Sequence, residues 1–490
     1  MIHTFQISYA LSLSDANLCA YRLNERTRKY EGYKITKFLD ISKNRGSLIF
    51  TLPELIGIKS IELLKYKDRD TRINFRIYFI IEAQLLLTGT DTLDLYFSSP
   101  ANAKELQMQY AKAINSLFPE AFNGRPASSL YNSGYADVTS YTDDEFEKAG
   151  LYSLPYLPLA SVTRMDFTFD AVSENEEHAR LFTEMLQKTY YDGRKKIEIK
   201  GINRNLATDK YCYDKVNENA SRSFSVYYKF DKMCAEEYDR RPNIEEIRDE
   251  ARNITRIEMS KFKPNRDTLK SMTTLQVPSN AISLGPLPYI ANEQVPTNVF
   301  LTEYIDKVGN GPGIKWYDRS KLKSRLNELQ KQHKIKAIEK DTLIKISQAI
   351  SQEQSLKKVI NAFKKEGEIT LHRKRDKNNK QVKEVFKCSI GRYKKYRDMA
   401  IQNGIMLVTI PGSRTIKELS AIPRLRNFDF SEVSSQAITK MLPYQSGSSI
   451  PELPELYDDI IGFLYGLYDN YNSKWNNRIE AISVPEEEEI

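Results

Sequence analysis

Three short segments in the middle of the chain alternate apolar and polar side chains, and this pattern most constrains the fold. They cover residues 161–170 (SVTRMDFTFD), 223–231 (SFSVYYKFD) and 254–262 (ITRIEMSKF). A period of two predicts β-strands whose successive side chains point to opposite faces of a sheet. Helical patterns separate these strands without a regular βαβ repeat. We therefore expect an α+β fold with a largely antiparallel sheet.

The flanking sequence predicts further elements. Residues 75–87 are apolar and β-branched, which predicts a buried strand, and residues 101–118 have the apolar spacing of a helix. Ser173 is the expected N-cap of a helix that runs to about Tyr190, with Glu176 at the capping-box position. The remaining expected elements are a short helix at 244–251, a Pro- and Gly-containing linker at 276–315, a charged helical stretch at 321–365, a polar turn between two short strands at 372–383, a basic helix at 389–403 and a strand at 405–410.

The length of the chain makes more than one domain necessary, because 490 residues exceed what a single hydrophobic core organises. We expect a core built on the antiparallel sheet with flanking helices, and a smaller basic C-terminal domain of helical or mixed structure. The predicted boundaries are 1–275 for the region that contains the core (N-terminal portion 1–125, core 155–275), 276–340 for the linker and charged helix, 341–425 for the basic accessory domain and 426–490 for a tail with an acidic end.

Composition excludes several classes of protein. The four cysteines form no C-x-x-C pair, and none has a histidine at the spacing typical of zinc ligands. Neither a zinc site nor a disulfide framework is therefore expected. No apolar run approaches about 18 residues, so we expect a cytoplasmic protein with no membrane partner. The net charge of +8 is modest, but lysine and arginine crowd between residues 357 and 397. That local excess favours a nucleic-acid surface, and the alternative is a solvated helix face.

The alternation also assigns polar side chains to strand faces. Asp166 and Asp170 share one face of the first strand, Tyr227 and Lys229 share one face of the second, and Glu258 lies on the third. If the three strands are neighbours, these side chains converge. Carboxylates can hold Mg²⁺ or Mn²⁺ against a phosphodiester, and a lysine can stabilise a phenolate or a pentavalent phosphate. Together these groups suit the transfer of a DNA 5′-phosphate onto tyrosine.

Structural interpretations of the same residues stay open. Most tyrosines in strands are packing residues, and Tyr228, on the apolar face of its strand, fits that role better than Tyr227. Arg164 and Arg256 have the spacing to pair with Asp166 and Glu258 across strands. A carboxylate on a strand is also commonly just solvated.

The ordered set of motifs resembles the gene II-type replication initiators of filamentous bacteriophages and related phage and plasmid replication proteins. The family's R-I-D-x-T-F strand is matched by RMDFTF at 164–169, its Y-x-K strand by YYK at 227–229 and its R-x-E strand by RIE at 256–258. The opening MIHTFQISYAL, the basic helix IGRYKKYRDMAIQNGI and the segment LVTIPGS also resemble family segments in order. The likeness covers most of residues 1–425 and is strongest at 161–262.

The resemblance implies a rolling-circle replication initiator, with a nuclease core and with residues 1–275 as the catalytic region. Such a protein nicks one strand at a phage or plasmid origin through a 5′-phosphotyrosine intermediate, here on Tyr227, and rejoins the displaced strand. Its expected partners are origin DNA, single-stranded or as supercoiled duplex, and a host helicase and polymerase in the bacterial cytoplasm. Lys229 is assigned to charge stabilisation. The alternative function is a non-enzymatic origin- or operator-binding protein in which the tyrosine is structural.

The expected metal site is mostly carboxylate. Relatives carry a G-H-N motif, whereas the nearest segment here has Thr88, Gly89 and Thr90 after Glu82, and no H-x-H pair exists. The assigned ligands of Mg²⁺ or Mn²⁺ are Asp166, Glu258, Asp170 and Glu82. The residues expected to contact DNA are Arg164, Arg256, Lys374, Arg375, Arg392, Lys394, Lys395 and Arg397. Phosphate contacts of this kind position a protein on DNA without reading its sequence.

Overall fold

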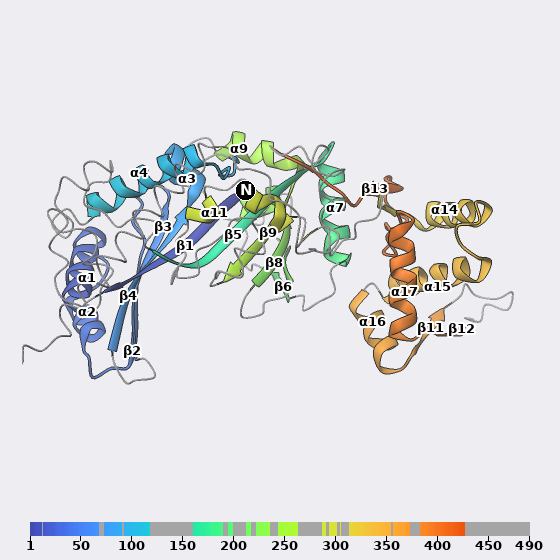
Figure 1. Cartoon of the computed structure of the whole chain (residues 1–490), viewed down its shortest axis with the longest axis horizontal. Helices are drawn as coiled ribbons and strands as arrows, with labels where there is room; N and C mark the ends of the chain where they lie inside the picture. The colour runs from blue at the N-terminus through green and yellow to red at the C-terminus, as the bar shows by residue number, and fades with distance from the viewer. Residues whose placement is uncertain are drawn as a thin grey trace, which may run out of the picture. The chain divides into compact units, whose positions relative to one another are not determined.

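A computed structural model gives the fold of the chain. It describes residues 1–11, 13–67, 73–90, 93–117, 160–189, 195–198, 212–216, 222–235, 244–262, 287–290, 294–300, 304, 313–353, 356–372 and 383–426. The structure is mixed α and β, with an antiparallel sheet and helices (Figure 1). The predicted α+β class is therefore confirmed. No helix in the described part of the chain has both the length and the apolar character needed to cross a bilayer.

The described residues form two compact units. Those within Met1–Phe167 and Lys261–Asn298 belong to the first unit, and those within Thr168–Ser260 and Val299–Tyr444 belong to the second. The region predicted as catalytic, residues 1–275, thus contributes to both units. Strand β5 (Ser161–Val172) begins in the first unit and ends in the second.

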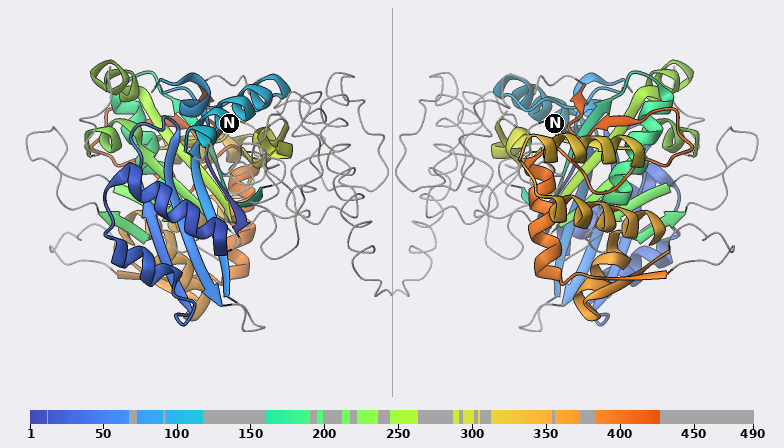
Figure 2. Two further views of the ribbon diagram at one scale, coloured as in Figure 1. Left: turned by 90° about the vertical axis from the view of Figure 1, so that its left-hand side faces the viewer. Right: turned by 90° about the vertical axis from the view of Figure 1, so that its right-hand side faces the viewer.

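The first unit is built on strands that alternate cleanly. In sheet order they are β2 (Arg45–Phe50), β3 (Ile58–Lys67), β4 (Ile73–Glu82), β1 (Ile2–Leu11) and the start of β5. Every second residue of β4 from Phe75 to Ile81 is buried, as expected for a strand with one covered face. Helices α1 (Leu13–Thr27) and α2 (Gly32–Leu39) pack against this sheet (Figure 2).

The strand predicted at 75–87 is right only as far as Glu82. Residues Ala83–Thr88 form helix α3, because alanine, glutamine and leucine favour helix and lack β-branching. Gly89, in the left-handed conformation, ends the helix. Helix α4 (Pro100–Leu117) confirms the prediction at 101–118 and packs beside α3.

The second unit continues the sheet from the end of β5. The order is β5, β9 (Ile254–Phe262), β8 (Arg222–Tyr228), β7 (Cys212–Val216) and β6 (Lys195–Glu198). Helix α7 (Glu176–Thr189) packs on β8 and β9. Its Thr183 hydroxyl lies 2.8 Å from the Thr255 hydroxyl, and its Gln187 side chain donates to the Val226 carbonyl at 3.2 Å. The predicted strands at 161–170 and 254–262 are thus confirmed.

The predicted N-cap of α7 is wrong by two residues. The side chain of Asn175 accepts a hydrogen bond from the His178 backbone N–H at 3.0 Å, so Asn175 caps the helix. Ser173 instead donates its backbone N–H to the Asn253 carbonyl. Glu176 binds Arg180 rather than a cap N–H, so it forms no capping box.

The strand predicted at 223–231 ends early. Tyr228 is the last residue of β8, and Lys229 begins helix α8 (Lys229–Ala235). The alternation therefore stops one residue before Lys229, which does not share a strand face with Tyr227 as predicted. After α9 (Ile244–Glu250) and a short turn of 3₁₀-helix at Ala251–Asn253, the chain enters β9.

The C-terminal part of the second unit is mostly helical. Its elements are β10 (Lys315–Tyr317), α14 (Arg319–Lys331), α15 (Ala337–Glu353), α16 (Leu356–Lys365), β11 (Glu368–His372), β12 (Lys383–Lys387), α17 (Ile390–Gln402), β13 (Glu418–Ser420) and β14 (Arg424–Leu425). The charged stretch at 321–365 is three helices, and the two short strands around 372–383 are present. The second view of Figure 2 shows α14 above α15 with α17 upright at one end of them, and α15 contacts both of the other helices.

Two expectations in this region need correction. The expected linker at 276–315 contains two short helices, α11 (Leu287–Ile290) and α12 (Gln294–Phe300). Residues 405–410 are not a strand, because only Ile405 and Ile410 form bridges, each isolated from the other. Their apolar character reflects burial rather than strand pairing. The basic helix is confirmed, with Ser389 as the N-cap of α17.

Candidate functional site around Tyr227

Tyr227 lies near the end of β8 with its hydroxyl between an acid and a base. The hydroxyl donates a hydrogen bond to the Glu258 carboxylate on β9. It accepts one from the Lys232 ammonium on α8 at 3.1 Å, and the same ammonium lies 4.6 Å from the centroid of the tyrosine ring. The side chain of Tyr227 is fully buried. A phenol held in this way has a proton acceptor and a stabilising cation already in contact.

The local chain path explains this arrangement. Because β8 and β9 are neighbours in the sheet, Glu258 can meet Tyr227 from the adjacent strand, as the alternation predicted. Because helix α8 begins two residues after Tyr227, its first turn brings Lys232 back over the tyrosine ring. Sequence reasoning missed Lys232 because it extended the strand through this segment. The signal that was present is KFDKMCA, which spaces Lys229 and Lys232 one helical turn apart.

The electrostatics of the cluster keep Glu258 ionised. Burial of its carboxyl opposes ionisation, but the positive charge of Lys232, the hydrogen bond from Tyr227 and the charges of Arg256 and Lys229 outweigh that effect. The pKa of Glu258 therefore lies below its ordinary value. Glu258 is a carboxylate at neutral pH and can accept a proton from the phenol. Lys229 is itself buried and acts on the cluster through its charge.

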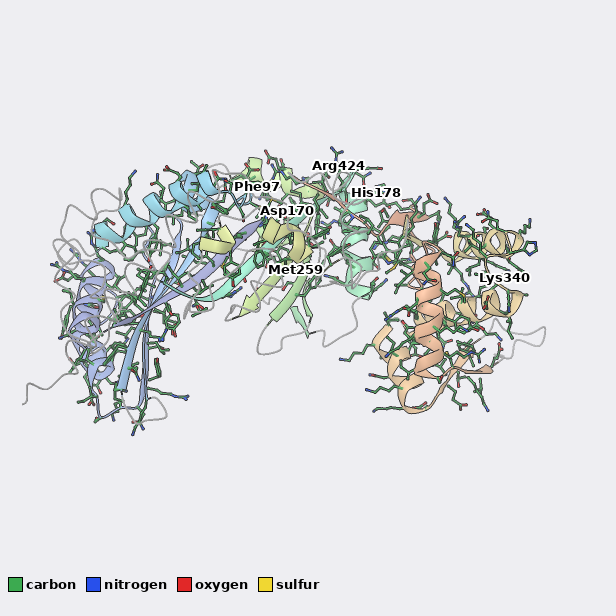
Figure 3. The ribbon with its side chains drawn as sticks, viewed as in Figure 1. Phe97, Asp170, His178, Met259, Lys340 and Arg424 are labelled. Carbon is green, nitrogen blue, oxygen red and sulfur yellow. The ribbon has the colours of Figure 1, made fainter. Side chains whose placement is uncertain are left out.

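Arg256 and Asp170 form a buried ion pair beside the cluster. Two guanidinium nitrogens of Arg256 each lie 2.7 Å from a different carboxylate oxygen of Asp170, and the two side chains are 2% and 1% exposed. Figure 3 labels Asp170 on β5 and Met259 on β9, the two strands that carry the pair. Arg256 was expected to contact DNA, but its guanidinium is buried and bound to Asp170. That expectation is corrected: Arg256 serves the interior of the second unit.

The carboxylates predicted to bind metal are each held by a basic neighbour or a phenol. Asp166, in the first unit, binds Arg164 at 2.7 Å, and Glu82 binds Lys59 at 3.1 Å. Asp170 binds Arg256, and Glu258 binds Tyr227 and lies in the field of Lys232. The Thr168 hydroxyl on β5 is buried without a hydrogen-bond partner. Among the residues that the structure describes, no group of three His, Cys, Asp or Glu side chains is arranged to hold a metal ion. The Mg²⁺ or Mn²⁺ site therefore stays a prediction.

The neighbouring Tyr228 has a different environment. Its hydroxyl donates to the Arg252 carbonyl at 2.7 Å, and the Arg180 guanidinium lies 4.4 Å from its ring centroid. Burial raises the pKa of Tyr228 above its ordinary value. With a backbone carbonyl in place of a carboxylate, Tyr228 has no proton acceptor comparable to Glu258. Of the two adjacent tyrosines, Tyr227 is therefore the better candidate nucleophile.

The predicted DNA-contacting residues of the C-terminal region lie in different environments. On α17, Arg392, Lys394 and Lys395 are exposed, whereas Arg397 binds Asp398 at 2.7 Å. Lys374 and Arg375 lie outside the described residues. The prediction that this region contacts DNA is not tested by these positions.

The second unit also contains a cavity. It has a volume of about 300 Å³ and is lined by residues of β5 and α7 and by the segment from Leu419 to Arg424. Figure 3 labels His178 and Arg424 on its wall. Tyr227, Glu258 and Lys232 are not among its lining residues.

Comparisons with known proteins give no match. No protein-family model, no curated protein and no solved structure was found to be similar to this chain.

Proposed function

We propose that the chain transfers a DNA 5′-phosphate onto Tyr227, as a rolling-circle replication initiator does. In this proposal it nicks one strand at a phage or plasmid origin, holds the 5′ end covalently and later rejoins the displaced strand, with a host helicase and polymerase extending the free 3′ end. The observation that carries the proposal is the Tyr227 hydroxyl held between the Glu258 carboxylate and the Lys232 ammonium. The family resemblance of the three strand motifs supports it.

The chemistry uses groups already in contact. Glu258 takes the phenolic proton as the Tyr227 oxygen attacks phosphorus. A bond forms between the tyrosine oxygen and phosphorus, and the bond from phosphorus to the 3′ oxygen breaks. The proton on Glu258 is then available to the departing 3′ oxygen, and Lys232 stabilises the negative charge that develops at the tyrosine oxygen. The predicted Mg²⁺ or Mn²⁺ remains part of the proposal, and when bound it would neutralise charge that develops on the phosphate.

Burial of Tyr227 favours a second candidate function. A fully buried phenol meets a phosphate only after the surrounding residues move apart. In the alternative, the chain is a non-enzymatic origin- or operator-binding protein, and the hydrogen bonds of Tyr227 only stabilise the second unit. The two candidates share DNA binding and differ in the covalent step.

A denaturing gel distinguishes the two candidate functions. The full-length chain is incubated with a 3′-labelled, mixed-sequence single-stranded DNA library, and covalent protein–DNA adduct is measured for wild type, Tyr227→Phe and Tyr228→Phe. We expect wild type and Tyr228→Phe to form adduct and Tyr227→Phe to form none, because no other oxygen occupies that position.

Circular dichroism spectra of the three proteins control for folding. DNA binding without adduct in the wild type supports the non-enzymatic candidate. Adduct that persists in Tyr227→Phe places the nucleophile elsewhere and rejects the assignment.

A further inference from the structure

Helix α16 separates apolar and basic residues completely. Leu356, Val359, Ile360 and Phe363 are buried. The opposite face is exposed and carries four lysines and an asparagine: Lys357, Lys358, Asn361, Lys364 and Lys365. The helix contains no acidic residue. Its exposed face is therefore uniformly cationic or neutral.

The exposed face of α16 has a regular internal geometry. Lys357 and Lys364 are seven residues apart, which places them two turns apart along one edge of the face. Lys358 and Lys365 form the second edge in the same way. Asn361 lies three or four residues from each of the four lysines, so it occupies the centre between the two edges.

The apolar side anchors α16 firmly. The Phe363 ring lies 6.0 Å from the Phe386 ring on β12 and 5.9 Å from the Tyr393 ring on α17, measured between centroids. Side chains on the far side of the helix are therefore presented on a packed support. In the described part of the chain, Lys357, Lys364 and Lys365 form no ion pair, so their charges are available to a partner.

Helix α17 provides an internal comparison. Asp398 lies three residues from Lys395 and four from Lys394, the position that Asn361 has on α16. Asp398 is exposed and binds the Arg397 guanidinium. A carboxylate at the centre of a face repels a phosphate backbone, whereas an amide does not. Of α16 and α17, α16 has the surface suited to a polyanion.

We propose that the exposed face of α16 binds double-stranded DNA, with the helix in the major groove. Lys357, Lys364 and Lys365 contact phosphates, and Asn361 lies at the base edges. A B-DNA major groove of about 12 Å admits one α-helix, and an asparagine side chain can bind adenine through two hydrogen bonds. Lysines on both edges of the helix suit a groove with phosphates on both sides. This inference is independent of the strand-transfer proposal, since it uses no residue of the Tyr227 cluster.

The test compares two variants that remove equal charge. One is Lys357→Gln/Lys364→Gln/Lys365→Gln on α16, and the other is Arg392→Gln/Lys394→Gln/Lys395→Gln on α17. Binding of the full-length chain to a labelled mixed-sequence 30-base-pair duplex, a length of roughly three helical turns chosen to exceed one site, is measured by fluorescence anisotropy across a salt series. We expect the α16 variant to lose more than about tenfold in affinity and to reduce the logarithmic salt slope by about 2 to 3. The α17 variant should change the slope by less than about 1.

A second pair of variants tests the centre of the face. Asn361→Asp should weaken binding strongly, because it gives α16 the central carboxylate of α17, whereas Asp398→Asn should leave binding nearly unchanged. Asn361→Ala should keep the mixed-sequence affinity and reduce base preference in duplexes selected from a random library.

Several outcomes overturn the proposal. If the two triple variants lose equal affinity for the duplex, the effect is due to net charge alone. If the α17 variant loses more affinity, the DNA-binding surface is on α17. Equal or tighter binding to duplex RNA or to phosphatidylserine vesicles assigns the face to another polyanion. If the α16 triple variant fails to fold, Lys364→Gln alone, with an expected slope change of about 1, replaces it. If the wild type forms no adduct but the α16 variant still reduces the salt slope, strand transfer fails and this inference stands. If the wild type forms adduct but the α16 variant leaves the salt slope unchanged, this inference fails and strand transfer stands.

Discussion

The Tyr227 cluster and the exposed face of α16 use charge in opposite ways. Around Tyr227, the charges of Arg256, Asp170, Glu258 and Lys232 are engaged by one another or by the phenol, within a largely buried region. On α16, the lysines line a water-exposed face with no acidic residue in the helix. Enclosed charges hold a structure in one arrangement and can be tuned for chemistry. Exposed charges contribute little to folding and remain available to a partner.

The largest effect is expected when the buried ion pair between Arg256 and Asp170 is broken. Asp170→Ala should lower the free energy of unfolding by about 3–5 kcal/mol, because it leaves the Arg256 guanidinium buried without its carboxylate. The matched change in an exposed pair, Asp398→Ala on α17, should cost about 0–1 kcal/mol. Urea unfolding followed by circular dichroism measures both. Similar losses in the two variants would show that the Arg256–Asp170 pair is hydrated in solution.

The effect of pH on the stability contributed by Glu258 is expected to be intermediate in size. The pKa of Glu258 is lowered in the folded chain from an ordinary value of 4.5, so ionised Glu258 stabilises the fold above that pH. This contribution is lost as pH falls through the folded pKa. The stability difference between wild type and Glu258→Gln should therefore be constant from neutral pH down to about 5 and shrink below about 4.5.

The measurement is the urea midpoint of both proteins at pH 7, 5, 4 and 3.5, a series that spans the carboxyl range around 4. A difference that grows as pH falls would mean that Glu258 has a raised pKa and is protonated in the folded chain. Such a result would remove the proton acceptor from the proposed mechanism.

The smallest expected effect is on the stability of α16. Lys364→Gln should change the free energy of unfolding by less than about 0.5 kcal/mol, because its side chain is exposed and forms no ion pair in the described structure. The same substitution should still reduce the salt slope of duplex binding by about 1. A loss of more than about 1 kcal/mol would show that Lys364 is part of the packing, and the contrast with the Tyr227 cluster would fail.

Much of the local structure follows from the sequence. Alternation predicted β5 and β9 and most of β8, and it placed Tyr227 and Glu258 where they meet. The basic helix predicted at 389–403 is α17, which Ser389 caps. These features depend on neighbours in the chain, through the two-residue period of a strand and the backbone hydrogen bonds at a helix end.

Other features could not be predicted because they depend on residues distant in sequence. The alternation of β5 implies one polar face, yet both Phe169 and Asp170 are buried, and Phe169 packs at 4.8 Å from Phe300, more than a hundred residues away. Arg256 had the spacing to pair with Glu258, but it binds Asp170 on the neighbouring strand.

The sequence by itself predicted β5, β9 and most of β8, and it predicted which side chains of these strands share a face. The tertiary structure decided which faces are covered, which acid meets which base, and that Lys232 donates to the Tyr227 hydroxyl. The physical reason is that alternation fixes the direction of a side chain relative to its own backbone. Burial and pairing are set by whatever other part of the chain packs against that side chain.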